Sequence, residues 1–119
     1  MTTLDCALEQ RGLTCVDFVK IDAEGLDYSV LAGAEHALHS HTFGAVQFEY
    51  NRPWAEVGAT LGGARRLLAQ HGYRLFALRA DGLYTFDYEH YGEFFGYANF
   101  VALSPAWVAE CSRLVCGRL

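Results

Sequence analysis

Lys20, Asp22 and Glu24 stand at alternate positions in the run VDFVKIDAEGLDYSVL, which is otherwise largely apolar around them. Closely spaced carboxylates can remove a proton from a substrate, bind a cation or accept hydrogen bonds from a ligand. Lys20 is the only lysine of the chain, and an acid two residues away favours a partly buried ion pair. If desolvated, Lys20 could instead act as a base. Acids at a strand end also cap helices or hold loops, and spacing alone leaves both roles open.

A second group of polar residues ends the next apolar run, AVQFEY. Gln47, Glu49 and Asn51 alternate and therefore share one face of an extended strand. In open α/β sheets, ligands bind outside the carboxyl ends of the strands. If the two strands are neighbours, Asp22 and Glu24 crowd the same rim of the sheet as Glu49. Such acids repel one another unless one is protonated, a cation lies among them or a ligand donates hydrogen bonds.

Other residues that could bind a metal or react chemically occur in less specific patterns. The spacing of His36, His39 and His41 resembles that of metal ligands, but the end of an amphipathic helix favours a solvated position. The four cysteines form two loose pairs without a C-x-x-C motif, which favours free thiols in a reducing cytoplasm. We therefore predict no metal site and a cytoplasmic protein.

Strands that alternate with helices must position the candidate rim. This order predicts a parallel sheet covered by helices, with a hairpin as an antiparallel addition. The first strand is nearly continuous in apolar residues, which is typical of a parallel strand buried on both faces. The expected elements are a helix to about Gln10 ended by Gly12, a strand at 16–21, a helix at 26–40, a strand at 45–50, a helix at 60–71 closed by Gly72, a hairpin turning at Asp81-Gly82, an aromatic loop at 88–97, a strand at 98–103 and a helix from Pro105 to about Val115.

Composition excludes several classes of function. The 119 residues suit one domain, and the net charge of −5 argues against a nucleic-acid partner. No run of about 20 apolar residues is present, so we expect no membrane span. The acidic, periodic N-terminus does not have the pattern of a signal peptide.

The run TLDCALEQRGLTCVDFVKIDAEGLDYSVLAGAE resembles the FkbM family of S-adenosylmethionine-dependent methyltransferases. A segment of the form V-D-F-(hydrophobic)-K-I-D-x-E-G-x-(D/E) is a hallmark of that family. VQFEYNRP, HGYRLF, EFF and ANFVALS follow in the family's order, so the resemblance extends over nearly the whole chain.

The resemblance implies an α/β fold of the Rossmann-like methyltransferase type, with strand order 3-2-1-4-5-7-6 and strand 7 antiparallel. On that map the chain supplies strands 4-5-7-6 flanked by helices, the C-terminal half of the sheet, so residues 1–119 are a partial methyltransferase domain. The glycine-rich turn and the acid that hold the cofactor in such folds have no counterpart in the sequence. We therefore expect a fragment of a longer enzyme, inactive alone; completion by another chain and loss of catalysis are the alternatives.

The resemblance also implies the reaction, in which S-adenosylmethionine donates a methyl group to a hydroxyl of a sugar or secondary metabolite. Two other functions compete with this one. A non-catalytic module could associate, as a homo-oligomer or with a partner, through the exposed edge of the first strand. A metal-dependent enzyme could use Asp22, Glu24 and Glu49 as ligands. The expected site residues are Lys20, Asp22, Glu24 and Glu49 for catalysis, Asp22 also for the cofactor, and Asn51 and Trp54 for the substrate.

Overall fold

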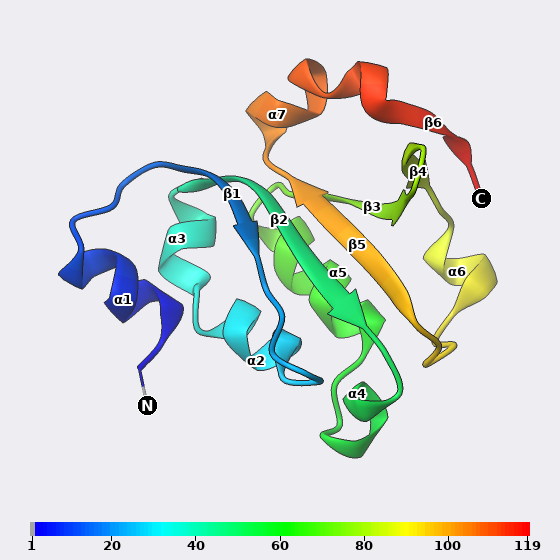
Figure 1. Cartoon of the computed structure of the whole chain (residues 1–119), viewed down its shortest axis with the longest axis horizontal. Helices are drawn as coiled ribbons and strands as arrows, with labels where there is room; N and C mark the ends of the chain where they lie inside the picture. The colour runs from blue at the N-terminus through cyan, green and yellow to red at the C-terminus, as the bar shows by residue number, and fades with distance from the viewer. Residues whose placement is uncertain (1) are drawn as a thin grey trace.

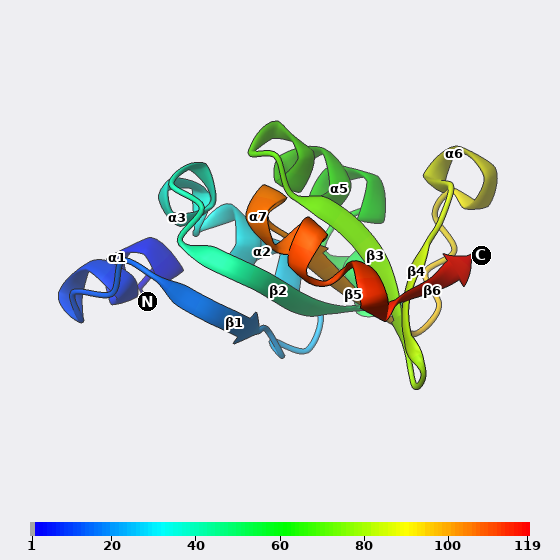
Figure 2. The same cartoon turned by 90° about the horizontal axis from the view of Figure 1, so that it is seen from above.

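A computed structural model describes residues 2–119 as a six-stranded mixed sheet with helices on both faces. Figure 1 shows the strands side by side, and Figure 2 shows α3 and α5 on one side of the sheet. None of the helices in residues 2–119 is both long and apolar enough to cross a membrane. The strands are β1 (Val16–Lys20), β2 (Phe43–Tyr50), β3 (Arg74–Arg79), β4 (Gly82–Thr85), β5 (Ala98–Leu103) and β6 (Val115–Arg118). The helices are α1 (Leu4–Gln10), α2 (Asp27–Ala32), α3 (Glu35–His39), α4 (Pro53–Glu56), α5 (Leu61–Gln70), α6 (Tyr88–Tyr91), α7 (Pro105–Glu110) and the 3₁₀ turn η1 (Ser112–Leu114).

The strand order across the sheet is β1-β2-β5-β3-β4-β6. β1 and β2 are parallel, and their crossover contains α2 and α3. β5 is antiparallel to both of its neighbours, β2 and β3. The β3–β4 hairpin adds an antiparallel pair, and β6 lies parallel to β4 at the far edge. The sheet is therefore mixed, and its parallel β1–β2 pair lies next to the candidate rim.

Alternation along β2 divides the core between the two faces of the sheet. Val46, Phe48 and Tyr50 are fully buried on the side of α2, α3 and α5. Ala45 faces the other way, in a smaller cluster against which Trp107 of α7 packs. The larger cluster includes Leu31, Leu38, Leu61, Leu68, Tyr73 and Phe100.

The helix expected at 26–40 is wrong, because the structure divides it into α2 and α3. Gly33 ends α2, and its carbonyl oxygen accepts a hydrogen bond from the Asp5 backbone. The Asp5 carboxylate then accepts hydrogen bonds from the backbone N–H groups of His36 and Ala37, at 2.8 and 2.9 Å. A side chain from α1 thus begins α3, and no local periodicity could reveal that partner.

Two further expectations near the C-terminus need correction. The last helix ends at Glu110 rather than near Val115, and residues 115–118 instead pair with β4 as β6. In the hairpin, Arg79 pairs with Gly82, so Ala80 and Asp81 form the two-residue turn in place of Asp81-Gly82. The aromatic loop at 88–97 contains the short helix α6.

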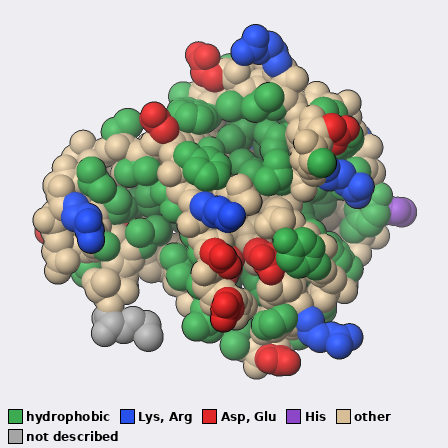
Figure 3. All heavy atoms as spheres, viewed as in Figure 1, with side chains coloured by type: hydrophobic (Ala, Val, Ile, Leu, Met, Phe, Trp, Pro, Cys, Tyr) green, Lys and Arg blue, Asp and Glu red, His purple; other side chains and the backbone are tan. Residues whose placement is uncertain are grey.

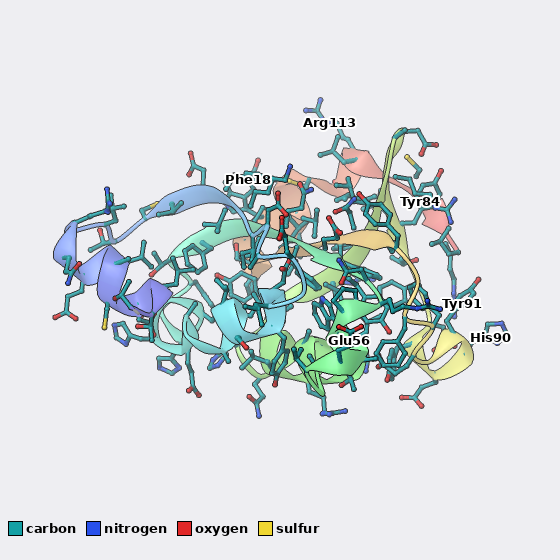
Figure 4. All side chains as sticks on the ribbon, turned by 60° about the horizontal axis from the view of Figure 1, so that its bottom comes forward. Phe18, Glu56, Tyr84, His90, Tyr91 and Arg113 are labelled. Atoms are coloured by element: carbon teal, nitrogen blue, oxygen red, sulfur yellow. The ribbon has the colours of Figure 1, made fainter. Side chains whose placement is uncertain are left out.

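β1 is an edge strand of the described sheet, which contradicts the expected burial on both faces. Asp17, Phe18 and Lys20 are exposed, and Phe18 is 52% exposed. Figure 4 places Phe18 on the side of the sheet away from α5. Within residues 2–119, β2 alone pairs with β1, so one row of β1 backbone groups has no strand partner.

Candidate functional site

The loop after β1 turns away from the sheet before it reaches Glu24. The N–H of Ile21 still donates to the carbonyl of Gln47, at 2.8 Å. Glu24 and Gly25 then adopt positive φ angles of 51° and 98°. A side chain on Gly25 would collide with Pro53, because its Cβ would lie 2.6 Å from the Pro53 Cβ. The extended backbone therefore ends early, and alternation alone does not place Glu24 on the face of Lys20.

Asp27 joins this loop to the end of β2. Its side chain is 1% exposed, and its two carboxylate oxygens accept hydrogen bonds from the N–H groups of Ala23 and Glu49, each at 3.0 Å. The sequence analysis missed this residue, although the final (D/E) of the family motif marks its position. We call this pair of hydrogen bonds the Asp27 brace.

Burial raises the pKa of Asp27 above its usual value, and the two backbone hydrogen bonds only partly offset that effect. The negative charges of Glu49 and Asp22 raise the pKa of Asp27 further. Both acids therefore lie close enough to Asp27 for their charges to act on it. The structure thus gathers Asp22, Asp27 and Glu49 at the end of the β1–β2 pair.

The end of β2 is held by hydrogen bonds from the following turn. Asn51 Nδ2 donates to Glu49 Oε1 at 2.8 Å, and Trp54 Nε1 donates to the Glu49 carbonyl at 3.0 Å. Trp54 is completely buried against Phe48 and Tyr50, so its ring has no surface open to a substrate. Asn51 Oδ1 is buried and accepts no hydrogen bond from residues 2–119. The Asn51 side chain therefore fixes the Glu49 carboxylate through its Nδ2.

Lys20, Asp22 and Glu24 are all exposed, so the expectation of a partly buried Lys20 ion pair is wrong. Within residues 2–119, the one ion pair shorter than 4 Å joins Arg118 to Asp87, far along the sequence. Lys20 instead lies opposite Gln47 in the β1–β2 ladder. Figure 3 shows acidic side chains grouped beside a basic one on this face, below a hollowed apolar area.

In the part of the chain that the structure describes, no three His, Cys, Asp or Glu side chains lie together as a metal site would require. Asp22, Glu24 and Glu49 therefore do not form the ligand cluster of the metal-dependent alternative. His41 Nε2 lies 2.6 Å from the His71 carbonyl oxygen, and His39 packs edge-on against His71.

Three cavities of about 650, 350 and 250 Å³ lie away from the rim. The first lies between α1 and α3, the second beneath the aromatic loop, and the third on the open face beside α7. Asp22, Glu24 and Glu49 line none of these three cavities. At the rim, Asp22 and Glu24 are exposed and Glu49 is half-buried.

The model of the methyltransferase FkbM domain matches residues 1–75. The chain belongs to the FkbM methyltransferase family. The match includes the K-I-D-x-E-G motif, the Asp27 brace and the end of β2, and it stops at the start of β3. The segments EFF and ANFVALS lie beyond the match, so their resemblance to the family stays a prediction. No curated protein and no solved structure matches the chain.

A second carboxylate in this FkbM chain, Glu93, holds the aromatic loop. It accepts hydrogen bonds from the N–H groups of Leu61 and Gly62 at the start of α5, each at 2.8 Å, and from the hydroxyls of Tyr50 and Tyr88. Burial disfavours its charge, but these four hydrogen bonds outweigh that effect and lower the pKa of Glu93 below its usual value. We call this arrangement the Glu93 clamp.

Tyr50 connects the Glu93 clamp to β2. Burial, together with donation to Glu93, raises the pKa of Tyr50 to about 12, so its hydroxyl stays protonated near neutral pH. The same hydroxyl oxygen accepts a hydrogen bond from the N–H of Phe95, at 2.9 Å. The clamp therefore fixes the aromatic loop relative to the strand that carries Glu49.

Proposed function

We propose that this chain is the acceptor side of an S-adenosylmethionine-dependent O-methyltransferase, with a hydroxyl of a small molecule as the acceptor. Family membership supports the methyltransferase class. The observed order β1-β2-β5-β3, with β5 antiparallel, supports an assignment to strands 4-5-7-6 of a Rossmann-like methyltransferase sheet. The unpaired edge of β1 would then join the strands that hold most of the cofactor.

The Asp27 brace is the observation that carries the proposed site. It fixes the β1 loop against the end of β2, so that Asp22 and Glu49 lie at one rim. Methyl transfer is an in-line displacement in which the acceptor oxygen gains a methyl group and loses its proton. Because both Asp27 oxygens accept backbone hydrogen bonds, Asp27 is a positioning residue rather than the base.

An acid of the rim would accept the hydroxyl proton. Asp22 and Glu24 are the candidates on the loop, and Glu49 is the candidate on β2. Asn51 would position Glu49 for the acceptor, because its Nδ2 donates a hydrogen bond to Glu49 Oε1. Trp54 would contribute indirectly, since its indole holds the Glu49 backbone.

S-adenosylmethionine would supply an electrophilic methyl group. The residues described here fit that cofactor only in part, since the rim is open and the chain contains no glycine-rich turn after a strand. Calorimetric titration of the 119-residue chain with S-adenosylmethionine should therefore give no measurable heat of binding. Tight binding would refute the proposal that most of the cofactor site lies outside these residues. A mass that doubles with concentration in light scattering would favour association through the β1 edge instead.

Substitutions then test the acids in a chain that also carries cofactor-binding strands. If one of them is the base, Asp22→Asn, Glu24→Gln or Glu49→Gln should lower kcat by about 10²–10⁴-fold. Glu56→Gln is the matched control, because Glu56, labelled in Figure 4, is an exposed acid on α4 beyond the end of β2. Equal activity of all four variants would rule out a rim acid as the base.

A further inference from the structure

The cavity beneath the aromatic loop has the size and lining of a ligand site. Its volume of about 350 Å³ falls at the small end of the range for small-molecule pockets, about 300–1,000 Å³. The end of β3, the start of β5, the aromatic loop and the C-terminal Leu119 enclose it. The aromatic residues among its lining are Phe86, Tyr91, Phe94, Tyr97 and Phe100.

One residue of this cavity, Asn99 of β5, lies next to Glu49 of the rim. Asn99 lines the cavity and pairs with Glu49 in the β2–β5 ladder. Paired residues of neighbouring strands project from the same face of a sheet, so Asn99 and Glu49 lie side by side on one face. Asn99 Nδ2 also donates to the hydroxyl of Tyr97, at 3.3 Å. A ligand hydroxyl group beside the Asn99 side chain would therefore lie on the face of Glu49, whereas Phe100 pairs with Phe48 on the face that the helices cover.

The lining distinguishes between classes of acceptor. Arg79 is the one charged side chain among the lining residues, and Asn99 supplies the one amide. A sugar presents many hydroxyl groups that need polar partners, whereas an aromatic ring stacks on aromatic side chains without them. The Arg79 guanidinium, 5.9 Å from the centre of the Tyr84 ring, can pair with a carboxylate through two parallel hydrogen bonds.

We propose that this cavity binds a small aromatic carboxylate with a ring hydroxyl, stacked against Phe94 and Tyr97 and paired with Arg79. The inference rests on the proposed function only where it takes this molecule as the methyl acceptor. The Glu93 clamp keeps the walls in place before binding, because Glu93 and Phe95 hydrogen-bond to Tyr50. A pre-formed wall lowers the entropy lost when a ligand binds.

Titration of the ¹⁵N-labelled 119-residue chain with 4-hydroxybenzoate, followed by NMR, tests this proposal. Saturable shifts at the Arg79, Phe94 and Asn99 amides are the expected result. Arg79→Gln should weaken binding of 4-hydroxybenzoate about tenfold but leave the uncharged 4-hydroxybenzamide unaffected, since only the carboxylate pairs with Arg79. Arg74→Gln is the matched control, because Arg74 also lies on β3 and over an aromatic ring, 5.3 Å from the centre of Phe76.

A second pair of variants tests the aromatic wall. Phe94→Ala should weaken both ligands, whereas Phe18→Ala should not, although the two rings are similarly exposed at 47% and 52%. Absence of shifts at the cavity, stronger shifts with methyl glucoside, or equal effects of Arg79→Gln and Arg74→Gln would overturn the proposal. Binding without later methylation of the phenol would support the cavity as a binding site and count against the proposed function instead.

Discussion

Replacement of Asp27 by asparagine removes one acceptor of the brace. The amide keeps one oxygen but turns an NH₂ group toward a backbone N–H of Ala23 or Glu49, which then loses its partner. A hydrogen bond to a charged group contributes about 1.5–3 kcal/mol, and a buried N–H without a partner costs about 1–3 kcal/mol. Burial of the Asp27 charge offsets part of this contribution, as the raised pKa of Asp27 indicates. We therefore expect Asp27→Asn to lower the free energy of unfolding by about 1–3 kcal/mol.

Urea denaturation followed by circular dichroism measures this loss, and amide hydrogen exchange locates it. The Ala23 and Glu49 amides should exchange faster in Asp27→Asn, because one or both lose a buried acceptor. Asp22→Asn is the matched control: Asp22 lies in the same loop but is exposed, so its change should stay within about 0.5 kcal/mol. Equal stability of the two variants, with unchanged exchange at both amides, would refute the reasoning.

Two further predictions concern the Glu93 clamp and the packing of α7. Because folding lowers the pKa of Glu93 below its usual 4.5, the clamp stabilises the chain above about pH 4.5 and loses this effect as pH falls through the folded-state pKa. The difference in unfolding free energy between wild type and Glu93→Gln should therefore shrink between pH 7 and about pH 3, and a constant difference would contradict the clamp. Gly44→Ala should destabilise the chain by about 1–3 kcal/mol in thermal unfolding, because the new Cβ would overlap the Trp107 ring. Gly117→Ala, with 3.8 Å to the Tyr84 ring, should change stability by less than about 0.5 kcal/mol, and equal losses would argue against this packing.

Local sequence patterns predicted those helices and strands whose ends are set by residues close to them in the sequence. Thr3 caps α1 through the N–H of Cys6, and Thr60 caps α5 through the N–H of Gly63. Gly72 follows α5 with a φ of 82°, as a residue beyond a helix end often does. The apolar runs predicted β1 and β2 to within two residues of their observed bounds. The positions of Asp22, Glu24 and Glu49 near the ends of these strands were therefore predictable from the sequence.

Features that depend on distant partners could not be predicted in this way. The start of α3 is capped by Asp5, which lies about thirty residues earlier in the sequence. β6 forms because residues 115–118 pair with β4. The Asp27 brace joins residues 22 positions apart, so no local pattern could reveal that Asp27 accepts a hydrogen bond from Glu49. Glu93 was predicted only as part of a loop, because its hydrogen-bond partners Leu61 and Tyr50 are distant from it in the sequence.

The ionisation of Asp27 tests the central arrangement most directly, because its carboxylate senses the charges of Asp22 and Glu49. ¹³C NMR of the carboxyl carbons across a pH titration gives its pKa in the wild type, in Asp22→Asn and in Glu49→Gln. The account predicts an Asp27 pKa above the usual 3.8, lowered in both variants as one neighbouring charge is removed. An ordinary pKa for Asp27, unchanged by either substitution, would contradict the gathering of these acids at one rim.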